Sequence, residues 1–217
     1  MKLILISDTH EQHDRVEIPE CDVLVHAGDF TYTGGYSEIQ TAFHWLDKQP
    51  AKYVVAIAGN HDYLFERYPE AGREIVAQTR VHYLENSSVV LGDVKFWGSP
   101  YTPRFFDWAF NCDRADINKH WDLIPNDTDV LITHGPSMGT LDQAAPHFAS
   151  KHLGCYDLRE AIKRVRPKVH VFGHIHGGTY FGQHIFRDGT DHYNASVVNE
   201  AYKVVNKPII HKLDTVL

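Results

Sequence analysis

Cysteine pairs, long apolar runs and an excess of basic residues are all missing from this chain of 217 residues. Its three cysteines, Cys21, Cys112 and Cys155, are odd in number and far apart, so they indicate neither a disulfide framework nor a Cys-x-x-Cys site. That usage favours a reducing cytoplasm. The longest apolar run, residues 53–58, is far shorter than the roughly 20 residues of a membrane span, and Asp8 interrupts the opening segment too early for a signal peptide.

The charge balance is acidic, with 21 Lys and Arg against 28 Asp and Glu and a net charge of −7. Affinity for nucleic acid comes from lysine and arginine on phosphates, so we expect neither nucleic acid nor a membrane as a partner. A hydrophobic content of 43% is close to that of ordinary soluble domains, and the length suits a single domain, residues 1–217. Histidine, the commonest metal ligand, is abundant, with 16 copies.

Short apolar runs bounded by turn residues recur along the chain, as expected of β-strands buried on both faces. These predicted strands cover residues 2–7, 22–27, 52–58, 129–133 and 168–172. Their β-branched composition and their spacing indicate that they alternate with helices.

Helical periodicity lies between the runs, at 37–48, where Ser37 is a candidate N-cap, and at 158–166. Two further segments, 87–99 and 184–199, have the alternation and turn residues of β-hairpins. Strands that alternate with helices, together with hairpins, predict an α/β fold: a two-sheet β-sandwich flanked by helices.

Side chains that can bind metal follow all five predicted strands. They are Asp8, His10, Asp29, Asn60, His134, His174 and His176. Because ligands bind at the carboxyl ends of strands in open α/β sheets, we expect these seven side chains to share one rim. Residues two apart would project to the same side of an extended chain. The adjacent Gly28, Gly59 and Gly173 would let the backbone turn sharply beside the ligands.

The chemistry of this set points to transition metals. Carboxylate and imidazole together suit Mn²⁺, Fe or Zn²⁺ rather than Ca²⁺. Seven ligands exceed a tetrahedral zinc site but suit two ions about 3.5–4 Å apart that share a carboxylate, as in two-metal phosphoryl hydrolysis. We therefore expect two divalent metal ions as cofactors, with Mn²⁺ favoured and Fe or Zn²⁺ as alternatives.

Five short motifs occur in order: DTH (8–10), GD (28–29), GNHD (59–62), THG (133–135) and GHIH (173–176). This series resembles the calcineurin-like metallophosphoesterase superfamily and implies its fold. By this resemblance, the first metal would be held by Asp8, His10, Asp29 and His176. The second would be held by Asn60, His134 and His174, with Asp29 as the bridge. The resemblance leaves His61 as the general acid that protonates the leaving oxygen.

Segments outside the ligands resemble, more narrowly, the metallophosphoesterase-domain-containing (MPPED) group, which is related to class III cyclic nucleotide phosphodiesterases. They lie at 98–101, 105–111, 141–142 and 154–155. Some members of that group have Gly in place of the first His of GHxH and are feeble catalysts, whereas this sequence has His174. The chain departs from the protein Ser/Thr phosphatases, because their GDxxDRG is replaced by GDFTYTG.

These features predict a phosphodiesterase that hydrolyses a small phosphodiester or a nucleotide-like substrate. Metal-activated hydroxide would attack phosphorus, while His61 protonates the leaving alkoxide and Asp62 favours the imidazolium through its charge. The expected substrate-binding residues are Asn60, His61 and Arg104. Two alternatives stay open, a catalytically weak nucleotide-binding or scaffold protein on the same fold, and a nuclease.

Other candidates have simpler interpretations. His26 and His170 lie inside predicted strands and are expected to be core groups. Four more histidines are expected to be solvated, namely His44, His82, His120 and His211. The aromatic residues of 97–110 suit either stacking on a base or packing in a core, and the sequence leaves both open.

Overall fold

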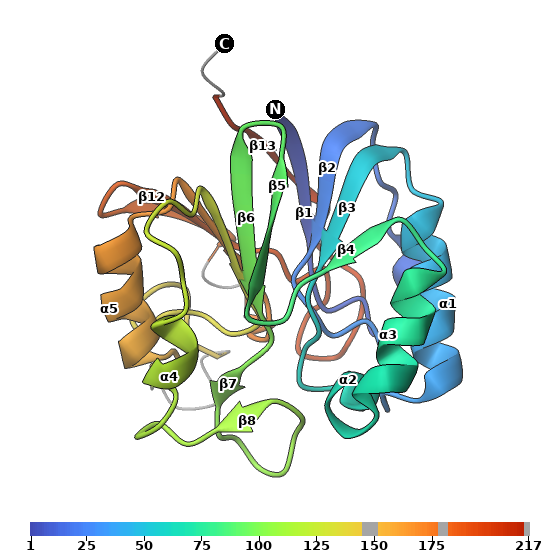
Figure 1. The fold of residues 1–217 in the computed structure, drawn as a ribbon, viewed down its shortest axis with the longest axis horizontal. Helices are drawn as coiled ribbons and strands as arrows, with labels where there is room; N and C mark the ends of the chain where they lie inside the picture. Colours follow the sequence, from blue (N-terminus) through green and yellow to red (C-terminus); the bar gives the residue numbers. More distant parts are fainter. Residues whose placement is uncertain (145–151, 178–181, 215–217) are drawn as a thin grey trace.

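Two β-sheets pack face to face and carry helices on their outer faces (Figure 1). The computed structural model describes residues 1–144, 152–177 and 182–214. The first sheet contains, in spatial order, β13 (Ile209–Lys212), β1 (Lys2–Ile6), β2 (Cys21–His26), β3 (Ala51–Ala56) and β4 (Val81–Tyr83). The second contains β11 (His184–Arg187), β12 (Thr190–Asn194), β10 (Val169–Phe172), β9 (Val130–Thr133), β6 (Val94–Ser99) and β5 (Ser87–Leu91).

The helices form two separate outer layers. Beside the first sheet lie η1 (His13–Arg15), α1 (Tyr36–Asp47), α2 (Tyr63–Arg67) and α3 (Pro69–Ala77). Beside the second lie α4 (Asn118–Trp121) and α5 (Tyr156–Val165). A short parallel pair, β7 (Thr102–Pro103) and β8 (Asn111–Cys112), lies beyond one end of the sandwich. Among the described residues, no helix has the length and apolar character needed to cross a membrane.

The apolar runs are long because both faces of the central strands are buried. In β1, Leu3 and Leu5 face the core between the two sheets, whereas Ile4 and Ile6 face the layer of α1 and α3. Each of these side chains is fully buried, and burial of one such side chain contributes about 1.5–3 kcal/mol. A third core lies between the second sheet and α5. The helix–sheet–sheet–helix layering therefore follows from central strands that bury side chains, most of them apolar, on both faces.

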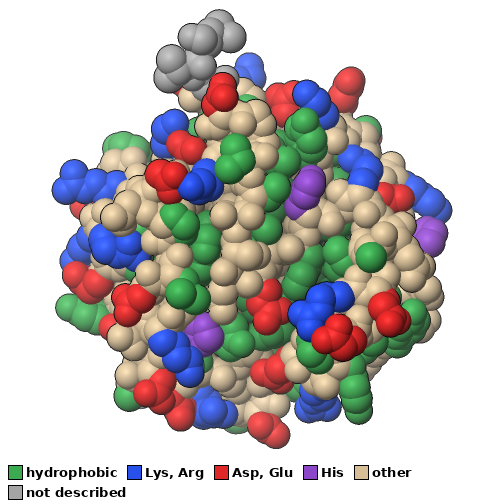
Figure 2. All heavy atoms as spheres, in the orientation of Figure 1, with side chains coloured by type: hydrophobic (Ala, Val, Ile, Leu, Met, Phe, Trp, Pro, Cys, Tyr) green, Lys and Arg blue, Asp and Glu red, His purple; other side chains and the backbone are tan. Residues whose placement is uncertain are grey.

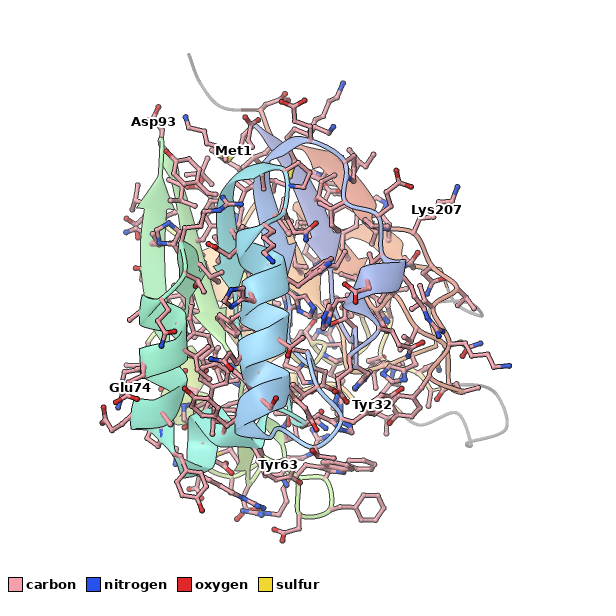
Figure 3. All side chains as sticks on the ribbon, turned by 90° about the vertical axis from the view of Figure 1, so that its right-hand side faces the viewer. Met1, Tyr32, Tyr63, Glu74, Asp93 and Lys207 are labelled. Atoms are coloured by element: carbon pink, nitrogen blue, oxygen red, sulfur yellow. The ribbon has the colours of Figure 1, made fainter. Side chains whose placement is uncertain are left out.

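Strand direction brings the ends of both sheets together. β1 to β4 are mutually parallel, as are β6, β9, β10 and β12. Ser7, just after β1, bridges to Ser196, and the amide of Val197 donates to the Ser7 carbonyl over 3.0 Å, which ties the two sheets at this end. Tyr32 and Tyr63 lie here, far from Met1 at the opposite end (Figure 3).

The predicted sandwich is confirmed. All five predicted strands form, with ends that differ by one or two residues, and both helical segments become α1 and α5. Both hairpins are confirmed as β5–β6 and β11–β12. Sequence periodicity did not single out α3, β4 or β13.

Two local expectations are wrong. Ser37 does not cap α1, because the helix already begins at Tyr36 with Gly35 in the N-cap position. The Glu38 carboxylate instead accepts hydrogen bonds from the amides of Thr33 and Gly34, just before the helix. His120 is not solvated but buried, and its ring stacks on Tyr101 with 3.6 Å between centroids.

Candidate metal centre

Backbone hydrogen bonds hold the loops after β1, β2, β9 and β10 against one another. The amide of Asp8 donates to the Gly28 carbonyl over 2.9 Å, and the amide of Gly173 donates to the His134 carbonyl over the same distance. The amide of His174 donates to the Asp8 carboxylate over 3.1 Å. Because these loops are fixed by backbone contacts, their side chains meet at one place without depending on side-chain packing alone.

The first group of ligand atoms belongs to Asp8, His10 and His176, and these atoms lie within 4.8 Å of one another. His176 Nε2 lies 3.5 Å from Asp8 Oδ1. His10 Nδ1 is hydrogen-bonded to the Thr31 carbonyl over 2.9 Å, so its Nε2 points into the group, where it is buried without a hydrogen-bond partner. Because this unpartnered nitrogen also lies close to the Asp8 and Asp29 carboxylates, it fits a metal ligand.

The second group centres on Asn60 and His134. Asn60 Oδ1 lies 2.9 Å from His134 Nε2 and 2.7 Å from His174 Nδ1. Asp29 Oδ2 lies 3.2 Å from His134 Nε2 and 3.8 Å from His10 Nε2. Asp29 therefore stands between the two groups, in the place that a bridging carboxylate would occupy, and the structure brings all seven predicted side chains together.

The ligand pairs are not on extended chain, and this expectation is wrong. Asp8, His10 and His174 have φ angles of 56°, 40° and 66°, in the left-handed region, as does Asp29 with 58°. Non-glycine residues adopt this conformation at a cost, and such residues cluster at functional sites. The side chains converge because the backbone turns sharply at the ligands themselves.

The glycines beside the ligands are required for two reasons, a left-handed backbone at one position and a lack of space for a side chain at two others. Gly28 has a φ of +97°, as a sharp turn requires. Gly59 and Gly173 instead lack room for a side chain, because a Cβ at Gly59 would overlap Asp29, and one at Gly173 would overlap Ser7 and Asp8. These glycines let neighbouring loops approach the ligands closely.

The centre buries two carboxylates that stay ionised. Burial would raise the pKa of Asp8, but its hydrogen bond with His176 and the charge there hold it at about 2. Burial would likewise raise the pKa of Asp29, but His134 holds it well below the usual range. His134 responds in the opposite direction, because Asp29 outweighs the effect of burial and raises its pKa to about 9. Two buried negative charges require nearby positive charge, which the neighbouring imidazoles supply here and which bound divalent cations would supply in their place.

His61 lies beside the ligands with one nitrogen fixed. Its Nδ1 is 2.8 Å from the Tyr32 carbonyl, so the ring faces the cavity with Nε2. The ring centroid lies 4.8 Å from that of His10. The ring nitrogen also groups with His10 and Asp29 as a potential metal ligand. The position of His61 therefore allows it to act either as a proton donor or as a metal ligand.

Asp62, which the sequence predicts to favour the imidazolium of His61 through its charge, directs its hydrogen bonds to other groups. The fully buried carboxylate accepts hydrogen bonds from the amides of Gly59, Asp29 and Thr31, and from the Thr31 hydroxyl. Burial, together with the charge of Asp29, raises the pKa of Asp62 to about 7. Asp62 fastens the loop after β2 to the loop after β3, so it is a positioning residue.

A cavity of about 440 Å³ opens over the centre. Asp29, Asn60 and His61 line it, together with His174 and His176. Arg104 lies on the cavity wall as well, but its Nε is paired with Asp113 Oδ1 at 2.5 Å and half of its side chain is exposed.

Tyr202 is a cavity residue that sequence reasoning missed. Its ring lies 4.8 Å from that of His10 and 5.1 Å from that of His176, and its φ of 55° is unusual for a bulky side chain. No motif surrounds it, and only the fold brings it to the ligands. Leu153 and Trp108 also line the cavity.

Comparisons with known proteins show which families and folds this chain resembles. A sequence model of calcineurin-like phosphoesterases matches residues 1–178. The chain is 37% identical over 238 residues to Metallophosphoesterase domain-containing protein 1 from Homo sapiens. This alignment covers 99% of this chain and 71% of that protein. It is 36% identical over 225 residues to a UPF0046 protein from Caenorhabditis elegans, with 97% and 74% covered. Among solved structures, TT1561 of Thermus thermophilus matches with a TM-score of 0.65 over 91% and 89% of the two chains, and at 10% identity this is a likeness of fold.

Proposed function

Because the chain belongs to the calcineurin-like phosphoesterase family, we propose that it is a dinuclear metal-dependent phosphodiesterase acting on a small phosphodiester. The observation that carries the proposal is the position of Asp29 between two groups of ligands, with His61 beside them. Such a centre suits hydrolysis of a phosphoester in which one side of the substrate contacts the metals and the other contacts a proton donor.

Two divalent cations are the proposed cofactors, with Mn²⁺ as the first candidate. One would be held by Asp8, His10, Asp29 and His176, and the other by Asn60, His134, His174 and again Asp29. When bound, such cations supply Lewis acidity toward phosphoryl oxygens and lower the pKa of a water molecule to about 7. The chain's own contribution is to fix the orientation of each ligand, since His10 and His134 are held through Nδ1 by the carbonyls of Thr31 and Ala27.

His61 is the proposed general acid. Its Nδ1 donates to the Tyr32 carbonyl, which leaves Nε2 to carry the proton that the leaving oxygen takes. Asn60 and His61 line the cavity and are the proposed contacts to the substrate phosphate. Arg104 would add a third contact after exchanging Asp113 for the phosphate.

Substrate size and surface charge favour a small phosphoester, a nucleotide among them, over a nucleic acid. A cavity of about 440 Å³ is in the range of small-molecule sites. On the face shown in Figure 2, acidic and basic side chains are interspersed and form no basic stripe.

Three buried cysteines without disulfide partners support a reducing compartment such as the cytoplasm.

The direct test is to load the purified protein with Mn²⁺, measure bound metal, and compare bis-p-nitrophenyl phosphate with p-nitrophenyl phosphate as substrates. We expect two metal ions per chain and faster turnover of the diester. The variant His61→Ala should keep both metals and lose about 10²–10⁴-fold in rate. His44→Ala, at an exposed position of α1, is the matched control and should keep full rate.

Three results would each contradict a part of the proposal. Bound metal without turnover of either ester would favour a binding or scaffold role. Full activity in His61→Ala would remove the general acid from the mechanism. Loss of metal in that variant would instead identify His61 as a ligand.

A further inference from the structure

Two aromatic side chains from the loop between β7 and β8 stand on the wall of the cavity. The ring of Trp108 packs on that of His61, with 4.2 Å between centroids. The ring of Phe105 meets that of His174 edge-on at 6.3 Å. Both line the cavity, and Phe105 remains half exposed although it is a large apolar group.

The loop is fastened to the centre at several points, so the two rings have defined positions. The amide of Ala109 donates to the carbonyl of the ligand residue Asn60 over 3.1 Å. The amide of Phe110 donates to Glu66 in α2 over 2.7 Å. The side chain of Asn111 accepts a hydrogen bond from the amide of Phe105 and donates to the Phe105 carbonyl.

The rest of this wall is also largely apolar. Pro103, Pro136, Leu153 and Ile175 line the cavity beside the two rings. The polar lining groups are the residues of the centre together with Thr102, Arg104, Arg114 and Glu200. A phosphoester bound here therefore has its charged phosphate at the polar floor and an organic group against an apolar, aromatic wall.

We propose that the cavity selects phosphoesters with a flat aromatic group, which packs on Trp108 next to the phosphate. The inference rests on the proposed function, because it uses the phosphate position and the role of His61 from that proposal. The organic group bonded to the oxygen that His61 protonates lies on the His61 side, and Trp108 is the ring that covers this side. Trp108 is thus a specificity-determining residue, and Phe105 flanks the same group from the His174 side.

Phe106 provides a matched control within the same loop. It is 80% exposed and packs on Phe105, but it is not among the residues that line the cavity. Truncation of Phe106 removes an aromatic ring of the loop without changing the wall. Truncation of Trp108 changes the wall.

The experiment measures binding of three phosphonates that cannot be hydrolysed to the Mn²⁺-loaded protein: methylphosphonate, cyclohexylphosphonate and phenylphosphonate. Calorimetry gives each dissociation constant, and inhibition of bis-p-nitrophenyl phosphate turnover gives a second value. We expect phenylphosphonate to bind about tenfold more tightly than methylphosphonate, the size of effect expected for one stacked ring. It should bind about threefold more tightly than cyclohexylphosphonate, because a flat ring stacks and a puckered one does not.

The variants assign this preference to a residue. Trp108→Ala should bring the phenyl-to-methyl ratio close to one, while Trp108→Phe and Phe106→Ala should keep most of it. An unchanged ratio in Trp108→Ala, or equal binding of all three phosphonates by the unmodified protein, would overturn the inference. Failure of the proposed function is distinguishable, because it appears as absent turnover in the unmodified protein, whereas failure of this inference leaves turnover intact and removes only the preference.

Discussion

Buried histidines occur in two kinds of place in this molecule, within strands and directly after them, and the two kinds differ in how their ring nitrogens are used. Within β2, His26 uses both nitrogens, with Nε2 3.0 Å from the Thr9 hydroxyl and Nδ1 accepting from the Gly28 amide over 3.3 Å. Within β10, His170 contacts the Thr133 hydroxyl and His192. In these rings, both nitrogens have hydrogen-bond partners within the protein.

Histidines after the strands use only one nitrogen for orientation. His10, His61 and His134 each have Nδ1 on a backbone carbonyl and turn Nε2 to the centre. One fixed carbonyl sets the tautomer and leaves the other nitrogen to bind a metal ion or to transfer a proton. Burial alone therefore does not mark a residue of the centre, whereas a buried ring with one nitrogen anchored on a backbone carbonyl and the other directed at carboxylates does.

The largest expected effect, on metal binding and turnover, comes from replacing one histidine of each kind with alanine and comparing the two variants. His134→Ala should lose a metal ion and at least about a thousandfold in turnover, because it removes several kcal/mol of transition-state stabilisation. His170→Ala should keep both metals and lose about 2–4 kcal/mol of unfolding free energy, since it leaves a cavity and unpaired groups. Metal analysis, diester turnover and urea unfolding of both variants test the comparison. Loss of metal in His170→Ala with none in His134→Ala would reverse it.

Much of this division could be predicted from the chain. A histidine inside an apolar run, such as His26, must face a buried layer, and one that follows the run lies at the strand end where parallel strands expose their ligands. The strands were predictable for a related reason. Successive residues such as Ile4 and Leu5 point to opposite faces of the strand, and both are apolar because both faces are buried.

Other features depend on contacts between distant segments and leave no local signal. The left-handed turns at Asp8 and His174 have no sequence mark, because each is imposed by hydrogen bonds to another loop. His120 is buried because Tyr101, 19 positions earlier, folds onto it. Asp62 lies next to His61 in sequence, yet its carboxylate serves the backbone of a different loop.

Replacing Asp62 should have an intermediate effect. Its carboxylate binds the backbone of the loops that carry the ligands, but it belongs to neither kind of histidine site. Asp62→Asn replaces one accepting oxygen by an NH₂ group that opposes the amides of Asp29 and Gly59. We expect Mn²⁺ affinity to fall by about 10–100-fold, as for other residues that position ligands, with turnover recovered at saturating Mn²⁺. Asp93→Asn, at the exposed β5–β6 turn, is the matched control and should bind Mn²⁺ normally. Reduced turnover at saturating metal with unchanged affinity would instead make Asp62 part of the chemistry.

The smallest expected effect is on stability, and it concerns the histidines within strands. Burial and the nearby Arg187 lower the pKa of His192 to about 4, against about 6.5 in an unfolded chain. Between these two values the unfolded state binds more protons, so the free energy of unfolding decreases as the pH falls from 6.5 to 4. This one residue contributes a slope of up to about 1.4 kcal/mol per pH unit, which His192→Asn should remove, whereas His44→Asn on the surface should not. Urea unfolding of the metal-free proteins across this range measures the slopes. Equal slopes in the unmodified protein and His192→Asn would mean that the ring of His192 is already charged in the folded state, and the two kinds of histidine would then differ in position alone.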